Sequence, residues 1–214
     1  MLFPDDGPMG WPASVSAEME VLLALPLFRF TREKRRMAAR LRRERRGHDA
    51  SFIETLKKPQ PAVWACNELA RRDSEAVESL LEIAAEWMRA YDKRDQSSEA
   101  FDREVALRDT IRRKLIELTS IGKAILHEAR LSVYWKTLHT VYMTLQSYAT
   151  TSERSRVALR RGLITWHWLE DDSGRIAPTK QFPFKEVVGA HTEPPPRSAE
   201  KNKIRKSAES PNRN

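Results

Sequence analysis

Apolar residues recur every three to four positions in three successive segments of this chain, and this spacing constrains its fold more than any other feature. The segments are residues 77–91, 101–118 and 131–148. Such spacing places the apolar side chains on one face of an α-helix, and that face must be buried against another element. Short polar connections such as residues 92–98 separate the segments. The sequence therefore predicts a mainly α protein with an antiparallel helical bundle at residues 48–149.

The chain is long enough to bury a core of its own. It has 214 residues, of which 40% are apolar, as is typical of one compact domain with tails. Its single cysteine, Cys66, excludes an intramolecular disulfide and is typical of a reducing compartment. Acidic residues precede the first Lys or Arg, unlike a signal peptide, and the longest apolar run, residues 21–28, is too short to span a membrane. We therefore expect a cytoplasmic or nuclear protein.

The two ends of the chain are predicted to be less regular than the bundle. Residues 1–30 combine a Pro- and Gly-rich arm with a short apolar helix that Pro26 ends, because proline has no N–H for a helix interior. Residues 150–190 are predicted to form a short basic helix, which Gly162 ends, followed by one β-hairpin. Residues 191–214 have too little apolar content to offset the entropy lost on ordering, so we expect this basic tail to be disordered.

Five aromatic residues fall on the apolar faces of these predicted elements. Trp166 and Trp168 share one face of the hairpin, while Trp87, Trp135 and Tyr142 lie on the helical stripes. Paired aromatic side chains can stack on unpaired bases. At these spacings, however, core packing is the more common role, so we predict that all five are buried.

Most of the net charge of the chain lies in residues 31–47. This stretch contributes +7 to a formal net charge of +8, whereas residues 1–30 contribute −3, residues 48–179 are neutral and residues 180–214 contribute +4. Clustered positive charge of this kind favours an anionic partner. The cations of the stretch are Arg32, Lys34, Arg35, Arg36, Arg40, Arg42, Arg43, Arg45 and Arg46.

This basic stretch is predicted to form one helix of about four turns, with Thr31 as its N-cap and Gly47 as its stop. Met37, Ala38 and Leu41 form a narrow apolar seam, which leaves arginine on most of the other faces. Like charges four residues apart repel each other, and arginine is well suited to bidentate contact with phosphate. We therefore interpret the stretch as a polyanion-binding helix; a solvated helix surface is the alternative.

A second basic surface is predicted at residues 151–179. Its order of helix, glycine, strand, acidic turn "DDSG" and return strand resembles the recognition helix and wing of winged-helix DNA-binding domains. The resemblance implies contacts to DNA from Arg154, Arg156, Arg160 and Arg161 on the helix and from Arg175 at the wing. The alternative is a hairpin that only caps the bundle.

No catalytic constellation, metal-ligand cluster or phosphate loop is evident, so we predict a non-enzymatic protein without a metal or cofactor. The favoured interpretation is a mostly helical, regulatory or nucleic-acid-binding protein, with DNA and RNA both open. A second interpretation is a helical adaptor that inserts residues 21–30 into an anionic membrane surface beside the arginines. A third is a scaffold subunit that contacts a protein partner.

Overall fold

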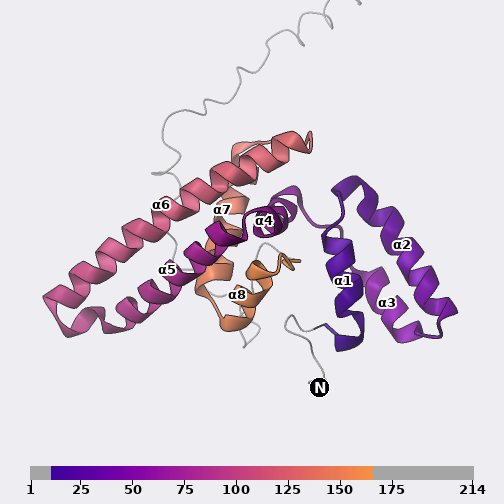
Figure 1. Ribbon diagram of the computed structural model, residues 1–214, viewed down its shortest axis with the longest axis horizontal. Coiled ribbons are helices and arrows are strands. Elements are labelled where there is room, and N and C mark those ends of the chain that lie inside the picture. Colours follow the sequence, from indigo (N-terminus) through magenta and orange to yellow (C-terminus); the bar gives the residue numbers. More distant parts are fainter. Residues whose placement is uncertain (1–10, 166–214) are drawn as a thin grey trace, which may run out of the picture. The chain divides into compact units, whose positions relative to one another are not determined.

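The computed structural model describes residues 11–165, which fold into eight α-helices and two short 3-10 helices (Figure 1). The prediction of a mainly α protein is therefore confirmed. The α-helices are α1 (Ser16–Leu23), α2 (Leu27–Arg43), α3 (Gly47–Thr55), α4 (Pro61–Arg72), α5 (Ser74–Lys93), α6 (Ser98–Glu128), α7 (Trp135–Thr150) and α8 (Glu153–Arg160). The 3-10 helix η1 (Ala13–Val15) precedes α1, and η2 (Arg94–Gln96) joins α5 to α6.

The predicted β-hairpin is without structural support. No β-strand is present among residues 11–165, and residues 166–179, which contain Trp166, Trp168 and Arg175, lie outside the described residues. The predicted disordered tail, residues 191–214, also lies outside them.

Helices α5 and α6 lie side by side and antiparallel, joined at one end by η2 (Figure 1). Each begins at a side chain that accepts a hydrogen bond from a backbone N–H: Asp73 caps α5 and Ser97 caps α6. Helices α4 and α7 pack against α6. The predicted apolar stripes supply the core, which includes Leu80, Ile111, Leu115, Leu118, Tyr142 and Leu145.

Gly122 does not break α6, although a kink or break is a plausible role for a glycine inside a helix. The helix continues to Glu128, and Gly122 faces α7 at close range. A Cβ atom at this position would lie 3.1 Å from the side chain of Val141. The missing side chain therefore lets the two helices approach each other.

The prediction of a buried stripe is wrong at two aromatic positions. Trp135 is 55% exposed and Phe101 is 52% exposed, whereas Trp87 and Tyr142 are buried as predicted. Helix α7 begins at Trp135 rather than at residue 131, because Arg130, two residues after the end of α6, has a left-handed conformation (φ 55°) that turns the chain away from the helix axis. Trp135 is thus in the first turn of α7, where its side chain faces solvent.

Helices α1, α2 and α3 share a core of their own. Its buried side chains come from η1, from all three helices and from Leu163 after α8, and are, among others, Val15, Met19, Leu22, Phe30, Ala38, Leu41, Ala50 and Ile53. Two hydrogen bonds from α4 join these three helices to the bundle. The indole of Trp64 donates to Leu25 O at 3.0 Å, and Arg71 donates to Leu23 O at 2.9 Å.

The basic helix differs from its prediction at both ends. Helix α2 begins at Leu27 directly after Pro26, because Leu27 and Phe30 extend the buried face beyond Thr31. It ends at Arg43, and Arg45 rather than Gly47 takes the left-handed conformation (φ 61°) that ends the helix. Gly47 instead begins α3.

The last described segment, residues 162–164, is held against α4. Asn67 is fully buried; its side-chain amide donates to Ile164 O at 2.9 Å and its amide oxygen accepts from Ile164 N at 2.8 Å. Arg71 donates to Gly162 O at 3.0 Å. Two polar side chains of α4 therefore satisfy the backbone that follows α8.

Candidate nucleic-acid interface

The side of α2 that faces away from the core carries a continuous row of arginines at steps of three and four residues. Helical geometry puts residues at these steps on one side. The residues also line one shallow surface hollow, together with Val21 and Leu25 near α1. We call this row the arginine stripe; its members are Arg29, Arg32, Arg36, Arg40 and Arg43.

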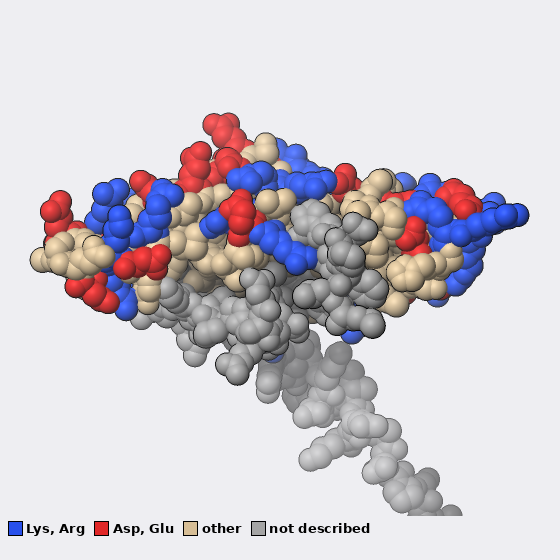
Figure 2. Space-filling model, turned by 90° about the horizontal axis from the view of Figure 1, so that it is seen from below, with Lys and Arg blue, Asp and Glu red and all other residues tan. Residues whose placement is uncertain are grey.

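Figure 2 shows Lys and Arg side chains concentrated at the right-hand end of the view, where Figure 1 places α2, with a smaller acidic area among them. Residues 11–58, which contain α1, α2 and α3, have twelve Lys or Arg and six Asp or Glu. Elsewhere on the visible face, blue and red areas alternate. The excess positive charge of the described residues is therefore concentrated on the three N-terminal helices.

Among the described residues, three carboxylates oppose the five arginines of the arginine stripe: Glu33, and Glu18 and Glu44, which both lie within 4.0 Å of Arg40. Glu33 accepts a hydrogen bond from Arg32 Nε at 3.1 Å and one from Arg36 Nη1 at 3.0 Å, so one negative charge serves two guanidinium groups. No carboxylate within residues 11–165 lies within 4.0 Å of the Arg29 or Arg43 side chain. The stripe therefore keeps a net positive charge at the surface.

Two other cations of α2 instead hold α3 in place. Lys34 Nζ donates to the carbonyl oxygens of Glu54 at 3.0 Å and Leu56 at 2.7 Å, which satisfies the end of α3. Arg42 binds the Glu54 carboxylate with two nitrogens, at 2.7 and 2.5 Å. This contact holds the pKa of Glu54 below its ordinary value. Both cations stabilise the fold and are less available to a ligand.

Arg46 joins three helical segments through a partly buried network. Its guanidinium donates to Asp49 at 2.7 Å, to Glu18 at 2.8 Å and to Ser14 O at 2.5 Å. Burial alone would raise the pKa of Asp49, but hydrogen bonds from Ser14 and Arg46 outweigh burial and lower this pKa. Arg40, at the inner edge of the stripe, also reaches Glu18, at 3.3 Å. Arg46 is thus a structural residue.

Arg35 and Arg45 are exposed and have no carboxylate partner within 4.0 Å in the described part of the chain. Arg45 projects from the turn that follows α2. Of the nine cations predicted to bind, Lys34, Arg42 and Arg46 therefore serve the fold, and the other six remain on the surface.

Sequence reasoning missed Arg29, because it placed the start of the helix at Thr31. A signal was present in the sequence: Leu27 and Phe30 continue the apolar spacing of Leu41 and its neighbours back to Pro26. Since proline favours the start of a helix, that spacing identifies a helix of which Arg29 is part.

The arginines of α8 are engaged with other helices of the protein. Arg160 binds the Glu78 carboxylate of α5 with two nitrogens, both at 2.7 Å, and this contact lowers the pKa of Glu78. Arg161 forms an ion pair with Glu20 of α1.

Arg156 of α8 binds Glu153 one turn earlier, at 2.6 Å, and lies against the sulfur of Met88. Arg154 is exposed on the same helix, and Arg175 lies outside the described residues. The structure thus brings the predicted cations of α8 to the bundle surface, but not to the arginine stripe.

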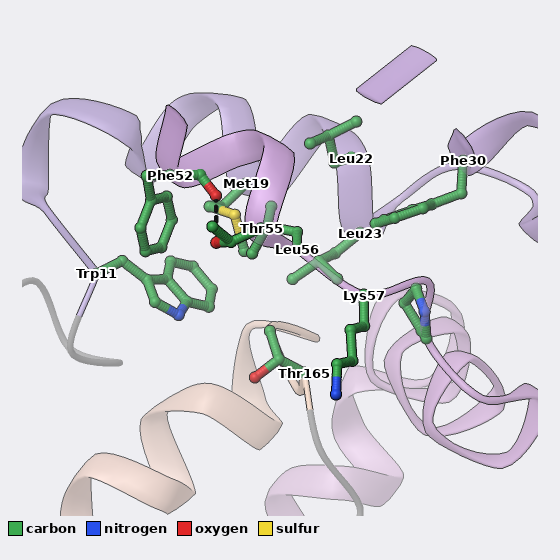
Figure 3. Close-up of a pocket in the computed structure, with 11 residues that line it drawn as sticks. Trp11, Met19, Leu22, Leu23, Phe30, Phe52, Thr55, Leu56, Lys57 and Thr165 are labelled. Atoms are coloured by element: carbon green, nitrogen blue, oxygen red, sulfur yellow. Dashed lines mark hydrogen bonds between the residues drawn. The ribbon is translucent and has the colours of Figure 1, made fainter. Parts of the chain in front are cut away.

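A separate apolar cavity of about 290 Å³ lies among α1, α2 and α3 (Figure 3). Trp11, Met19 and Phe52 form part of its wall, and Lys57 and Thr165 lie on the opposite side. The lining is predominantly aliphatic and aromatic, and it offers no pair of groups suited to acid–base chemistry.

Comparisons with protein-family models, with curated proteins and with solved structures found no match to this chain. Within residues 11–165, no helix is both long enough and apolar enough to cross a membrane. No group of three or more His, Cys, Asp or Glu side chains in the same residues is arranged to hold a metal ion.

Proposed function

We propose that this chain is a non-enzymatic nucleic-acid-binding protein whose arginine stripe contacts the phosphate backbone. The observation that carries the proposal is the row of five arginines, from Arg29 to Arg43, on one exposed side of α2. At 1.5 Å per residue the row extends over roughly 20 Å. Phosphates of one duplex strand are spaced roughly 3.4 Å apart along the axis, so several lie within reach of the row.

The division of the cations between two roles supports this proposal. Lys34, Arg42 and Arg46 contact carbonyl or carboxylate groups of the fold, whereas Arg29 and Arg43 have no carboxylate within 4.0 Å among residues 11–165. Like charges at helical spacing repel each other by a few tenths of a kcal/mol per pair. Three carboxylates of the described residues compensate the five arginines only in part, so the row is suited to an anionic ligand.

Burial of the apolar residues near α2 makes a membrane adaptor the less favoured proposal. Leu22, Leu23 and Phe30 are at most 2% exposed and form part of the protein core. Val21 and Phe28 are exposed large apolar residues of the same stretch. Since stable peripheral anchoring needs a substantial apolar insertion together with the basic residues, nucleic acid is the better-supported ligand.

The test removes the charge of the stripe without disturbing its structural contacts. The stripe variant replaces Arg29, Arg32, Arg36 and Arg43 with Gln, which forms helix nearly as well as Arg. Arg40 is kept because it contacts a buried carboxylate of α1. We expect weaker binding to fluorescein-labelled oligonucleotides and a smaller salt dependence, by roughly 0.7–0.9 in the slope of log K against log salt for each phosphate that the variant no longer binds.

A matched control removes the same charge from the bundle. It replaces Arg89, Lys93, Arg103 and Arg113 of α5 and α6 with Gln, so that both variants have four fewer positive charges. The proposal requires that the control bind nearly as the wild type does. Equal losses in both variants would indicate only a nonspecific effect of net charge, and no loss in the stripe variant would refute the proposal.

Vesicles of zwitterionic lipid with phosphatidylserine provide the comparison with the membrane alternative. Tight vesicle binding that Phe28→Asp abolishes, together with no measurable affinity for oligonucleotides, would favour the adaptor instead. Phe28 is the appropriate position because it is 78% exposed, whereas an aspartate at the buried Leu23 would unfold the N-terminal helices.

A further inference from the structure

We infer that a groove beside the start of the arginine stripe takes an unpaired nucleobase, so that the ligand of this protein is single-stranded nucleic acid. This inference rests on the proposed function and specifies its substrate class. The groove has a volume of about 840 Å³ and lies between the start of α2, the connection from α3 to α4 and the end of α6. We call it the base groove; its lining includes Pro26, Phe28, Pro59, Trp64, Arg130 and Leu131.

Within the described part of the chain, the base groove offers one exposed aromatic face on which a base can stack, the ring of Phe28. Phe28 is 78% exposed, the most exposed large apolar side chain among residues 11–165. The guanidinium of Arg29 lies 5.5 Å from the centre of its ring, at the start of the stripe. Trp64 also lines the groove, but it is only 5% exposed and its indole N–H is bonded to Leu25 O, so it forms the floor of the groove rather than a stacking face. Stacking on such aromatic faces tolerates any base, because every base has a π-face.

Charge in the base groove also favours an anionic ligand. Two carboxylates line it, but Arg72 binds both: Glu128 at 2.6 Å and Glu68 at 3.3 Å. Lys58 and Arg130 line the same groove with no carboxylate within 4.0 Å among the described residues. Phosphates that flank a stacked base would therefore meet cations at the rim.

The backbone at Arg130 is a second, independent observation. Its φ of 55° is in the left-handed region, which favours glycine because a Cβ atom is crowded there. The same geometry occurs at Arg45, where α2 ends next to the stripe. The chain thus has arginine at two positions where glycine would be more stable. Both residues end a helix, and at Arg130 the arginine in place of glycine also lines the base groove, where a binding role of its side chain would account for its retention.

Duplex nucleic acid cannot use the base groove, because its bases are stacked on one another and their faces are covered. Only an unpaired base can enter the groove while the neighbouring phosphates contact the stripe at Arg29 and Arg32. The geometry therefore predicts preference for single strands over duplex at equal length and salt.

The experiment measures binding of labelled oligo(dT), oligo(U) and a duplex of the same length. Phe28→Ala should weaken binding of both single strands on the order of tenfold and leave duplex binding unchanged. Phe28→Tyr should keep the wild-type affinity. The matched control is Phe101→Ala, which removes another exposed phenylalanine, on α6, and should have no effect.

A further variant separates a binding role of Arg130 from a structural one. Arg130→Gly should raise the melting temperature by about 2–4 °C, because glycine adopts positive φ without strain. The same variant should weaken single-strand binding. Greater stability with unchanged affinity would overturn the role of Arg130 in the base groove.

The two proposals fail in different ways. If the stripe variant loses affinity but Phe28→Ala binds single strands as the wild type does, or weakens duplex binding equally, the base groove is refuted and the proposed function stands. If the stripe variant binds oligonucleotides as well as the wild type does, the proposed function itself fails.

Discussion

Replacement of Asn67 should destabilise the protein more than most single substitutions, because its side chain is the hydrogen-bond partner of both backbone groups of Ile164 within residues 11–165. The amide and the backbone groups it contacts are fully buried, and the two hydrogen bonds measure 2.8 and 2.9 Å. Asn67→Ala removes both partners at once. The N–H and the carbonyl of Ile164 are then left unpaired in the interior, where water does not readily replace the amide.

The size of the effect follows from these two groups. A buried backbone group without a partner costs about 1–3 kcal/mol. Two such groups predict that Asn67→Ala lowers the free energy of unfolding by about 4 kcal/mol, within a range of about 2–6 kcal/mol. For a domain of this size that loss corresponds to a decrease of about 8–16 °C in melting temperature.

Asn67→Asp tests the hydrogen bonds separately from side-chain packing, because aspartate has nearly the same size and shape as asparagine. A protonated aspartic acid can still accept from Ile164 N and donate to Ile164 O, whereas the ionised form places negative charge against that carbonyl. The pKa of the new carboxyl should therefore be raised in the folded state. Relative to wild type, the stability of the variant should fall as the pH rises from about 4 through this raised pKa, and remain low above it.

Urea denaturation followed by tryptophan fluorescence measures both effects, at pH values of about 5 and about 8 for the aspartate variant. A loss below about 1 kcal/mol for Asn67→Ala would refute the view that this side chain holds the segment after α8. An aspartate variant whose stability relative to wild type is independent of pH would refute the assigned hydrogen bonds.

Three further predictions concern single positions. Gly162→Ala should lower the free energy of unfolding by at least about 1–2 kcal/mol in urea denaturation, because φ is +63° and a Cβ atom would lie 2.8 Å from a backbone oxygen of α4. Cys66 should react with a thiol reagent only after unfolding, since burial raises the pKa of its thiol. Asp49→Asn should reduce the loss of stability in acid. Burial would raise the pKa of Asp49, but hydrogen bonds from Ser14 and Arg46 lower this pKa. The stability that the Asp49 carboxylate confers is therefore present above about pH 4 and is lost as the pH falls through the lowered pKa.

The helical bundle could be predicted from the sequence because its signal is a repeated one. Many apolar residues at steps of three and four must all face the same core, and an error at one position leaves the pattern intact. Trp135 shows the limit of this reasoning. It fits the spacing of α7, but it lies in the first turn, beyond the surface that α6 covers.

Helix ends were harder to predict because they depend on a few atoms and on tertiary contacts. Thr31 has a hydroxyl suited to an N-cap. Burial of Leu27 and Phe30 nevertheless extends the N-terminal end of α2 back to Leu27, four residues before Thr31. Gly47 is suited to a C-cap, yet Arg45 takes the left-handed position. In both cases packing of the neighbouring helices outweighed a local preference of about 1 kcal/mol.

The charge of the candidate site could be predicted from composition, but the separation of its arginines into two roles could not. Arg42 and Arg46 are indistinguishable from Arg36 and Arg43 in the sequence. Glu54, the partner of Arg42, is 12 residues away on α3, and Glu18, one partner of Arg46, is 28 residues away on α1. Only the packing of α1 and α3 against α2 decides which guanidinium groups meet a carboxylate.

The separation of the α2 cations into two roles explains how the protein remains folded although arginines on the surface of α2 repel one another. The carboxylates of α1 and α3 compensate the cations at the inner edge of α2, so those contacts strengthen the fold. The outer row, including Arg29 and Arg43, faces water, where repulsion is weakened by solvent and salt. Under the proposed function, an anionic ligand on that row would remove the remaining repulsion and would bind the folded state alone, because an unfolded chain does not align the five guanidinium groups. The proposed function therefore predicts that ligand binding raises the stability of the fold, and that the charges that weaken the isolated helix would stabilise the complex.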